Sequence, residues 1–192
     1  MESILLLYDR LPQRSSKWWE NTHCSCAYNI HDVSTAKYQP GGTAILSINQ
    51  LSHKVQSHRQ HDSTGLGRWT STLYQGKNNT LLRVVQVYRP CHPNPHSPNG
   101  VYQQHSRYFL TKNIRTSPRT QFLLDLKNFL EECLDREEQL IVMGDFNENI
   151  THSPISTFFS ELGMHNLLFT LFENDYLHSP QTYSRGRNII DG

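Results

Sequence analysis

An acid and an amide, Asp145 and Asn147, stand two residues apart shortly after the largely apolar stretch Gln139–Met143. The stretch predicts a short buried strand, and the pair follows at its end. Side chains two apart on an extended backbone point to the same side, so both are expected to face one space. A carboxylate can bind a hard metal ion or take a proton from water, and an amide can hydrogen-bond a phosphate oxygen. The spacing therefore indicates phosphate chemistry.

A structural alternative stays open for the same residues. An isolated Asp-x-Asn more often forms an Asx turn that caps the end of a strand. Gly144 would let the backbone turn tightly, and Phe146 would anchor that turn in the core. Other motifs along the chain are needed to decide whether Asp145 and Asn147 form a functional site or only a turn.

The elements that would position the pair follow from the pattern of apolar residues. Strands are predicted over 43–48, 68–74 and 81–88, with a hairpin turn at 75–79. Ser117 and Pro118 predict a helix start, and the apolar spacing from 122 to 134 continues that helix. Helices are also expected over 101–110 and 155–162, a proline-rich loop over 91–100, a polar loop around a short element over 51–67, and irregular structure over 11–29. At the ends, 3–8 is expected to be a short strand or a helix start, and 181–184 and 187–191 to be strands.

Four landmarks in order resemble the endonuclease/exonuclease/phosphatase superfamily. They are Gly41-Gly42-Thr43-Ala44-Ile45, Val87-Tyr88-Arg89-Pro90, Gly144-Asp145-Phe146-Asn147 and Arg187-Asn188-Ile189-Ile190-Asp191. Gly67-Arg68-Trp69, before the hairpin at 76–79, is most similar to endonuclease-like domains of eukaryotic retroelements. The resemblance implies one domain over 1–192 of the α/β (α+β) class. Its architecture would be a four-layered sandwich of two packed mixed β-sheets flanked by helices, incomplete here.

The resemblance also implies roles for single residues. Asp145 would orient or deprotonate the attacking water, Asn147 would hold the scissile phosphate, and Tyr88 would reach the phosphate or an acid. Asp191 would support the metal ligands. Mg²⁺, or Mn²⁺, would neutralise charge on the phosphate oxygens, held by Asp145, Asn147 and the candidate metal glutamate Glu2.

Structural alternatives remain for several of these residues. Tyr88 is equally an aromatic residue at a strand end, and Asp191 a terminal acid. Arg89 and Arg185 could touch phosphate but are more often solvated surface arginines. The histidine-rich stretch 53–61 is interpreted as a polar loop, since its spacing gives no metal geometry.

Composition and charge set limits on the class of protein. The chain has 192 residues, 36% apolar and 18% charged, with a formal net charge of +1, which does not itself argue for nucleic acid. The four cysteines lack a zinc-site spacing and are predicted to be unpaired thiols. No signal peptide or membrane span is visible, so a soluble nuclear or cytoplasmic protein is expected.

The resemblance thus implies a metal-dependent phosphodiester hydrolase of retroelement origin that nicks DNA. No early asparagine matches the family, and no Asp-His dipeptide follows Asp145. The domain is therefore expected to be truncated at both ends, with weak or no activity. Two alternatives stay open: a non-catalytic remnant of a retroelement endonuclease, and a phosphatase of the same fold acting on phosphoinositides or small phosphoesters.

Overall fold

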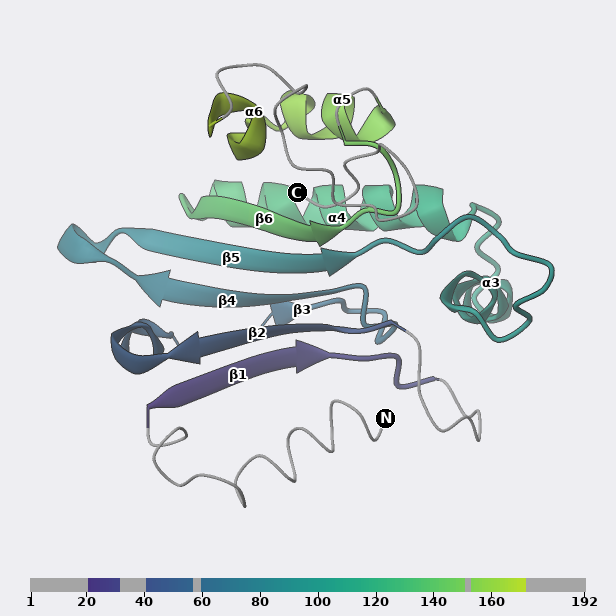
Figure 1. Ribbon diagram of the computed structural model, residues 1–192, viewed down its shortest axis with the longest axis horizontal. Coiled ribbons are helices and arrows are strands. Elements are labelled where there is room, and N and C mark those ends of the chain that lie inside the picture. The colour runs from purple at the N-terminus through teal and green to yellow at the C-terminus, as the bar shows by residue number, and fades with distance from the viewer. Residues whose placement is uncertain (1–20, 32–40, 57–59, 151–152, 172–192) are drawn as a thin grey trace.

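Two β-sheets form the centre of the protein, as a computed structural model shows for residues 21–31, 41–56, 60–150 and 153–171. In the first sheet, β1 (Thr22–Ala27) pairs antiparallel with β2 (Thr43–Ile48). The second has the order β3 (Gln60–His61), β4 (Trp69–Gln75), β5 (Leu81–Tyr88) and β6 (Gln139–Asp145). The pairs β3–β4 and β4–β5 are antiparallel, and β5–β6 is parallel, so the second sheet is mixed (Figure 1).

Helices connect and cover these strands. The α-helices are α3 (Val101–Thr111), α4 (Pro118–Asp135), α5 (Pro154–Glu161) and α6 (Leu167–Leu171), and two short 3₁₀ turns are η1 (Asn49–Lys54) and η2 (Lys77–Asn79). The Ser117 hydroxyl accepts a hydrogen bond from the Thr120 N–H at 3.1 Å, and Pro118 occupies the first turn. The predicted start of α4 is therefore confirmed. Within the described residues, every helix is too short or too polar to cross a membrane.

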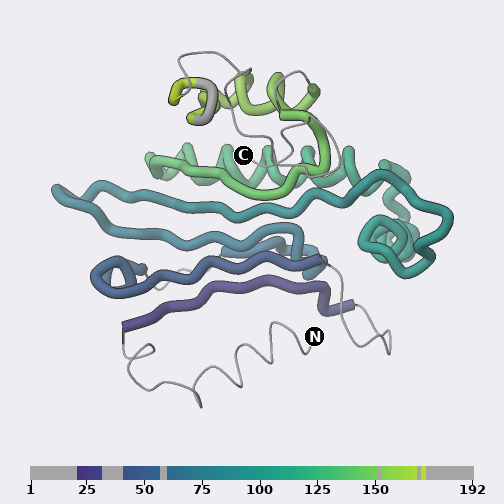
Figure 2. Tube along the Cα trace, in the orientation of Figure 1, coloured from purple at the N-terminus to yellow at the C-terminus, as the bar shows by residue number. Residues whose placement is uncertain are grey.

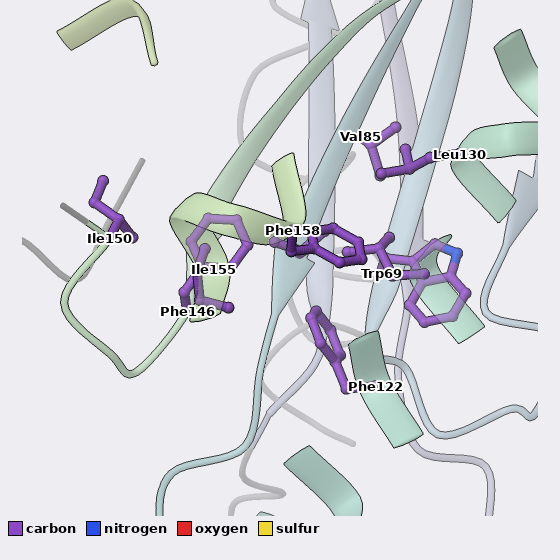
Figure 3. Close-up of a cluster of buried hydrophobic side chains, with 10 residues drawn as sticks. Trp69, Val85, Phe122, Leu130, Phe146, Ile150, Ile155 and Phe158 are labelled. Carbon is purple, nitrogen blue, oxygen red and sulfur yellow. The ribbon is translucent and has the colours of Figure 1, made fainter. Parts of the chain in front are cut away.

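The apolar core lies between α4 and the second sheet (Figure 3). Phe122, Leu126 and Leu130 of α4 are fully buried, as the helical spacing predicts. The Trp69 ring of β4 packs edge-on against Phe122, with 6.1 Å between the ring centroids. Phe146, 2% exposed, extends the cluster past the end of β6, so the predicted anchoring of this turn in the core is confirmed.

The opposite face of the second sheet meets the first sheet through hydroxyl groups. Thr72 of β4 donates to the Ser25 hydroxyl of β1 at 3.0 Å, and the Ser47 and Tyr74 hydroxyls lie 2.6 Å apart. All four residues are buried. The two faces of this sheet thus differ in chemistry: one packs apolar side chains against α4, and the other joins polar side chains to β1 and β2.

The predicted fold class is confirmed, since the described residues form a mixed α+β fold with two sheets and flanking helices. The prediction of irregular structure up to residue 29 is wrong, because β1 pairs with β2 along all six residues. Its sequence Thr-His-Cys-Ser-Cys-Ala has few strong strand formers, so the pairing sets its structure. The strand predicted over 139–143 continues to Asp145, and Met143 is 39% exposed, so this strand is not fully buried. The elements predicted over 3–8, 181–184 and 187–191 lie outside the described residues.

Candidate active site

The carboxyl ends of β5 and β6 meet at one edge of the second sheet. Tyr88 and Asp145 are register partners in this parallel pair, so their side chains leave the same face. Tyr88 lies on the face that carries Thr72 and Tyr74, which is the face toward the first sheet. Figure 2 shows the chain after β6 bending toward α5, while the chain after β5 continues past the sheet toward α3. The Arg89 N–H donates to the Asp145 carbonyl at 2.9 Å and extends the pairing by one step.

Asn147 lies beside both strand ends, but its backbone is not extended. Its φ is 49°, in the left-handed region, and its N–H donates to Asp145 Oδ1 at 2.8 Å. The predicted extended spacing of the two residues is therefore wrong, and the Asx turn that was its alternative is present. The turn nevertheless brings the amide to the site: Asn147 Nδ2 donates to the Arg89 carbonyl at 2.8 Å, and Oδ1 accepts from the Cys91 thiol at 3.0 Å. The Asx turn is therefore part of the candidate site.

Tyr88 completes the group. Its hydroxyl lies 3.9 Å from Cys91 Sγ, so the same thiol contacts both Tyr88 and Asn147. Burial raises the pKa of Tyr88 well above its usual range, and the neighbouring Cys91 and Asp145 side chains raise it further. The side chain is therefore a neutral hydroxyl at physiological pH. It can donate a hydrogen bond to a phosphate oxygen.

Gly144 is required by the close approach of β5. Its φ is +147°, and a Cβ at this position would lie 2.0 Å from the Val87 carbonyl oxygen. A contact this short to backbone cannot be relieved by a side-chain rotation. Glycine thus allows β6 to approach β5 at the residue before the candidate acid.

Arg89 is buried, so its interpretation as a solvated surface arginine is wrong, and its contact with phosphate stays a prediction. Its side chain is 6% exposed and pairs with Glu148, which also pairs with Arg119 of α4. Sequence reasoning missed Glu148, Arg119 and Cys91. Glu148 directly follows the Asp-Phe-Asn segment and Cys91 directly follows Tyr-Arg-Pro, which was the available signal.

The oxygen donors at this edge suit a hard divalent cation. Mg²⁺ is commonly held by one or two carboxylates together with water and substrate phosphate. Asp145 would supply the carboxylate and Asn147 an amide oxygen. Within the described parts of the chain, no three His, Cys, Asp or Glu side chains gather into a metal site. The predicted residues Glu2, Asp191 and Arg185 lie outside those parts.

The described residues form a mixed α+β fold with two sheets and flanking helices, and Tyr88, Asp145 and Asn147 meet at one edge of the second sheet. The chain belongs to the Endonuclease/Exonuclease/phosphatase family, whose model matches residues 5–189.

Two solved structures are similar to the chain. The human Nocturnin catalytic domain with bound sulfate anion is 13% identical, with a TM-score of 0.55, over 100% of this chain and 63% of that domain. At this identity the likeness shows the fold alone, and the chain spans under two thirds of that domain. A functionally unknown conserved protein from Enterococcus faecalis V583 is 20% identical, with a TM-score of 0.40, over 73% of this chain and 49% of that one. No curated protein matches the chain.

Proposed function

We propose that the protein is a Mg²⁺-dependent endonuclease that hydrolyses phosphodiester bonds in DNA. The observation that carries the proposal is the convergence of Tyr88, Asp145 and Asn147 at the ends of β5 and β6. An acid, a neutral hydroxyl and an oriented amide are the groups that hydrolysis of a phosphodiester needs around one phosphate.

Each of the three residues has its own role in the proposed hydrolysis. The Asp145 carboxylate orients the attacking water, and Asp145 with Asn147 would hold the cation, which supplies Lewis-acid stabilisation of the phosphate when bound. The amide of Asn147 positions the phosphate. Its orientation is fixed because Nδ2 donates a hydrogen bond to the Arg89 carbonyl. The Tyr88 hydroxyl donates to a phosphate oxygen, because its raised pKa keeps it protonated.

DNA as substrate, and a retroelement origin, rest on the Gly67-Arg68-Trp69 segment ahead of the hairpin. Arg68 and Trp69 are 1% and 2% exposed. Arg68 Nε and Nη2 donate to the two carboxylate oxygens of Asp62 at 2.7 and 2.8 Å, so the segment belongs to the core. Its support for kinship with retroelement endonucleases is its sequence alone, since a buried segment does not contact substrate.

The test is the conversion of supercoiled plasmid to nicked circles with and without Mg²⁺. We expect nicking that EDTA abolishes and that falls by about 10²- to 10³-fold in Asp145→Ala. Glu161→Gln is the matched control, because it removes the carboxylate of an exposed ion pair between Glu161 of α5 and Lys127 of α4. Plasmid left intact by the wild-type protein would assign the non-catalytic remnant instead, and equal nicking by Asp145→Ala contradicts the proposal. Phosphate release from inositol phosphates without nicking would instead assign the phosphatase alternative.

A further inference from the structure

Glu148 joins the two loops that carry the candidate site. One of its oxygens, Oε2, accepts from Arg89 Nη1, in the loop after β5, and from Arg119 Nη2, in the first turn of α4. Glu148 itself follows Asn147 in the loop after β6. One carboxylate oxygen thus connects three segments that are far apart in the sequence.

Arg119 reaches the backbone of the same two loops. Its Nη1 donates to the Pro90 carbonyl at 2.6 Å and to the Asn147 carbonyl at 3.3 Å. The planar guanidinium group makes these contacts together with the Glu148 pair, because its donors point outward in a fixed fork. Arg119 therefore holds the loops after β5 and β6 together through its contacts with Pro90, Asn147 and Glu148.

The positive charges of Arg89 and Arg119 explain why the Glu148 carboxylate is needed between them. The Arg89 and Arg119 side chains are 6% and 7% exposed, while Glu148 is 22% exposed. Burial would raise the pKa of Glu148, but the two arginines outweigh it and lower that pKa, so the group is ionised. Burial and the nearby Arg119 charge lower the pKa of Arg89, and Glu148 opposes both. Without Glu148, two buried cations would face each other unpaired.

The site residues depend on the position of these loops. Three hydrogen bonds hold Asn147 in its left-handed backbone conformation. Its N–H donates to Asp145, its side-chain amide donates to the Arg89 carbonyl, and its own carbonyl accepts from Arg119. Cys91, one residue beyond Pro90, donates to the Asn147 amide and touches Tyr88. A shift of either loop would change the distances between Tyr88, Asp145 and Asn147.

We infer that Glu148, held between Arg89 and Arg119, is a positioning residue of the active site that sets the separation of Tyr88 from Asp145 and Asn147. The inference rests on the proposed function for its effect on turnover. It acts through Asn147 and Arg89, without contact to substrate. A misplacement of about 1 Å at the reacting groups costs roughly 100-fold in rate.

The test compares Glu148→Gln, Arg119→Lys and the exposed control Glu161→Gln in the full chain. Glu148→Gln keeps the shape but removes the charge, and Arg119→Lys keeps the charge but removes the fork. We expect kcat for plasmid nicking to fall about 10- to 100-fold in both, with KM changed by less than about threefold. Glu161→Gln should behave as wild type.

The second readout is independent of activity. Cys91 is the exposed thiol among the four cysteines and hydrogen-bonds Asn147. Its alkylation by iodoacetamide, measured on the Cys91 peptide by mass spectrometry, should speed up roughly threefold or more when the loops separate. Thermal unfolding curves recorded alongside ensure that all rates are taken on folded protein.

Each outcome decides between the possibilities. Lower kcat at constant KM, with faster Cys91 alkylation in both variants, supports the inference. Unchanged kcat and unchanged alkylation overturn it, and so does a rise in KM alone, which would make Glu148 and Arg119 part of substrate binding. If the wild-type protein cleaves nothing, the proposed function fails. The positioning role is then decided by Cys91 alone: faster alkylation in both variants supports it, and unchanged alkylation overturns it.

Discussion

The backbone N–H of Asn147 donates to the side chain of Asp145 at 2.8 Å, so the candidate acid also shapes the turn that follows it. The carboxylate accepts this bond through Oδ1. A single side chain thus has a structural and a chemical role, and a suitable substitution can separate the two.

Asp145→Asn should make that separation. The new amide oxygen can still accept the Asn147 N–H, so the turn and the thermal midpoint should change little. The charge needed to hold a cation and orient water is lost, so Mg²⁺-dependent nicking should fall by about 10²- to 10³-fold. Initial nicking rates and thermal unfolding of the two proteins check this. Activity within threefold of wild type would contradict the role given to Asp145.

Gly144→Ala should destabilise the protein on the order of 3 kcal/mol. The added Cβ would lie 2.0 Å from the Val87 carbonyl oxygen, at a φ of +147° that alanine rarely adopts. Urea unfolding measures the loss. Gly163→Ala is the control, because its φ is +69° and no atom lies within 4 Å of the added carbon; its cost should be roughly 1 kcal/mol. Equal losses in the two variants would show that β5 and β6 do not approach so closely.

His105 of α3 should make stability depend on pH. It is 1% exposed, and burial together with the Arg68 charge lowers its pKa from 6.5 to about 4. Between these values the unfolded chain binds the proton and the folded protein does not, so stability falls as the pH drops from about 6.5 toward 4. At pH 5 the expected loss from this residue is about 2 kcal/mol.

The measurement for His105 is urea unfolding at pH 7.5 and pH 5. His105→Gln removes the titrating ring, so the variant should lose less stability than wild type over this interval, whatever its absolute stability. Equal losses in both proteins would mean that His105 titrates at an ordinary pKa.

Glu138→Ala should cost about 3 to 5 kcal/mol, because it leaves a buried charge unpaired. Arg83 is 1% exposed and donates Nη2 to Glu138 Oε1 at 2.9 Å, while Arg136 Nε donates to the same oxygen at 3.0 Å. Glu131→Ala on α4 is the control: Glu131 is half exposed, at 4.0 Å from Lys127, and should cost under about 0.5 kcal/mol. Chemical denaturation of both variants at two salt concentrations distinguishes them, since a buried pair responds less to salt.

The sequence predicted the elements in which apolar residues recur at a regular spacing or form a continuous stretch. The spacing of Phe122, Leu126 and Leu130 predicted α4, and the apolar stretches predicted β5 and β6, which place Tyr88 and Asp145 in register. The order of the second sheet and the meeting of Tyr88 with Asp145 at one edge were known only from the structure.

What escaped prediction depends on partners far along the chain. Glu148 pairs with Arg89 and Arg119 across 59 and 29 residues, and no periodicity marks such pairs. The left-handed φ of Asn147 is a property of the turn, so the even spacing from Asp145 gave a wrong direction for its side chain. Strand β1 forms because each of its six residues pairs with a residue of β2.

The hydroxyl pairs Ser25–Thr72 and Ser47–Tyr74 imply that the protein does not open as one unit. Contacts between hydroxyls exchange readily with water, whereas the aromatic cluster around Trp69 loses its stabilisation only when α4 detaches. The first sheet is therefore expected to be less protected than β5 and β6. Its amide protons should exchange with deuterium well before those of β5 and β6, so the strands that carry Tyr88 and Asp145 stay intact through these openings.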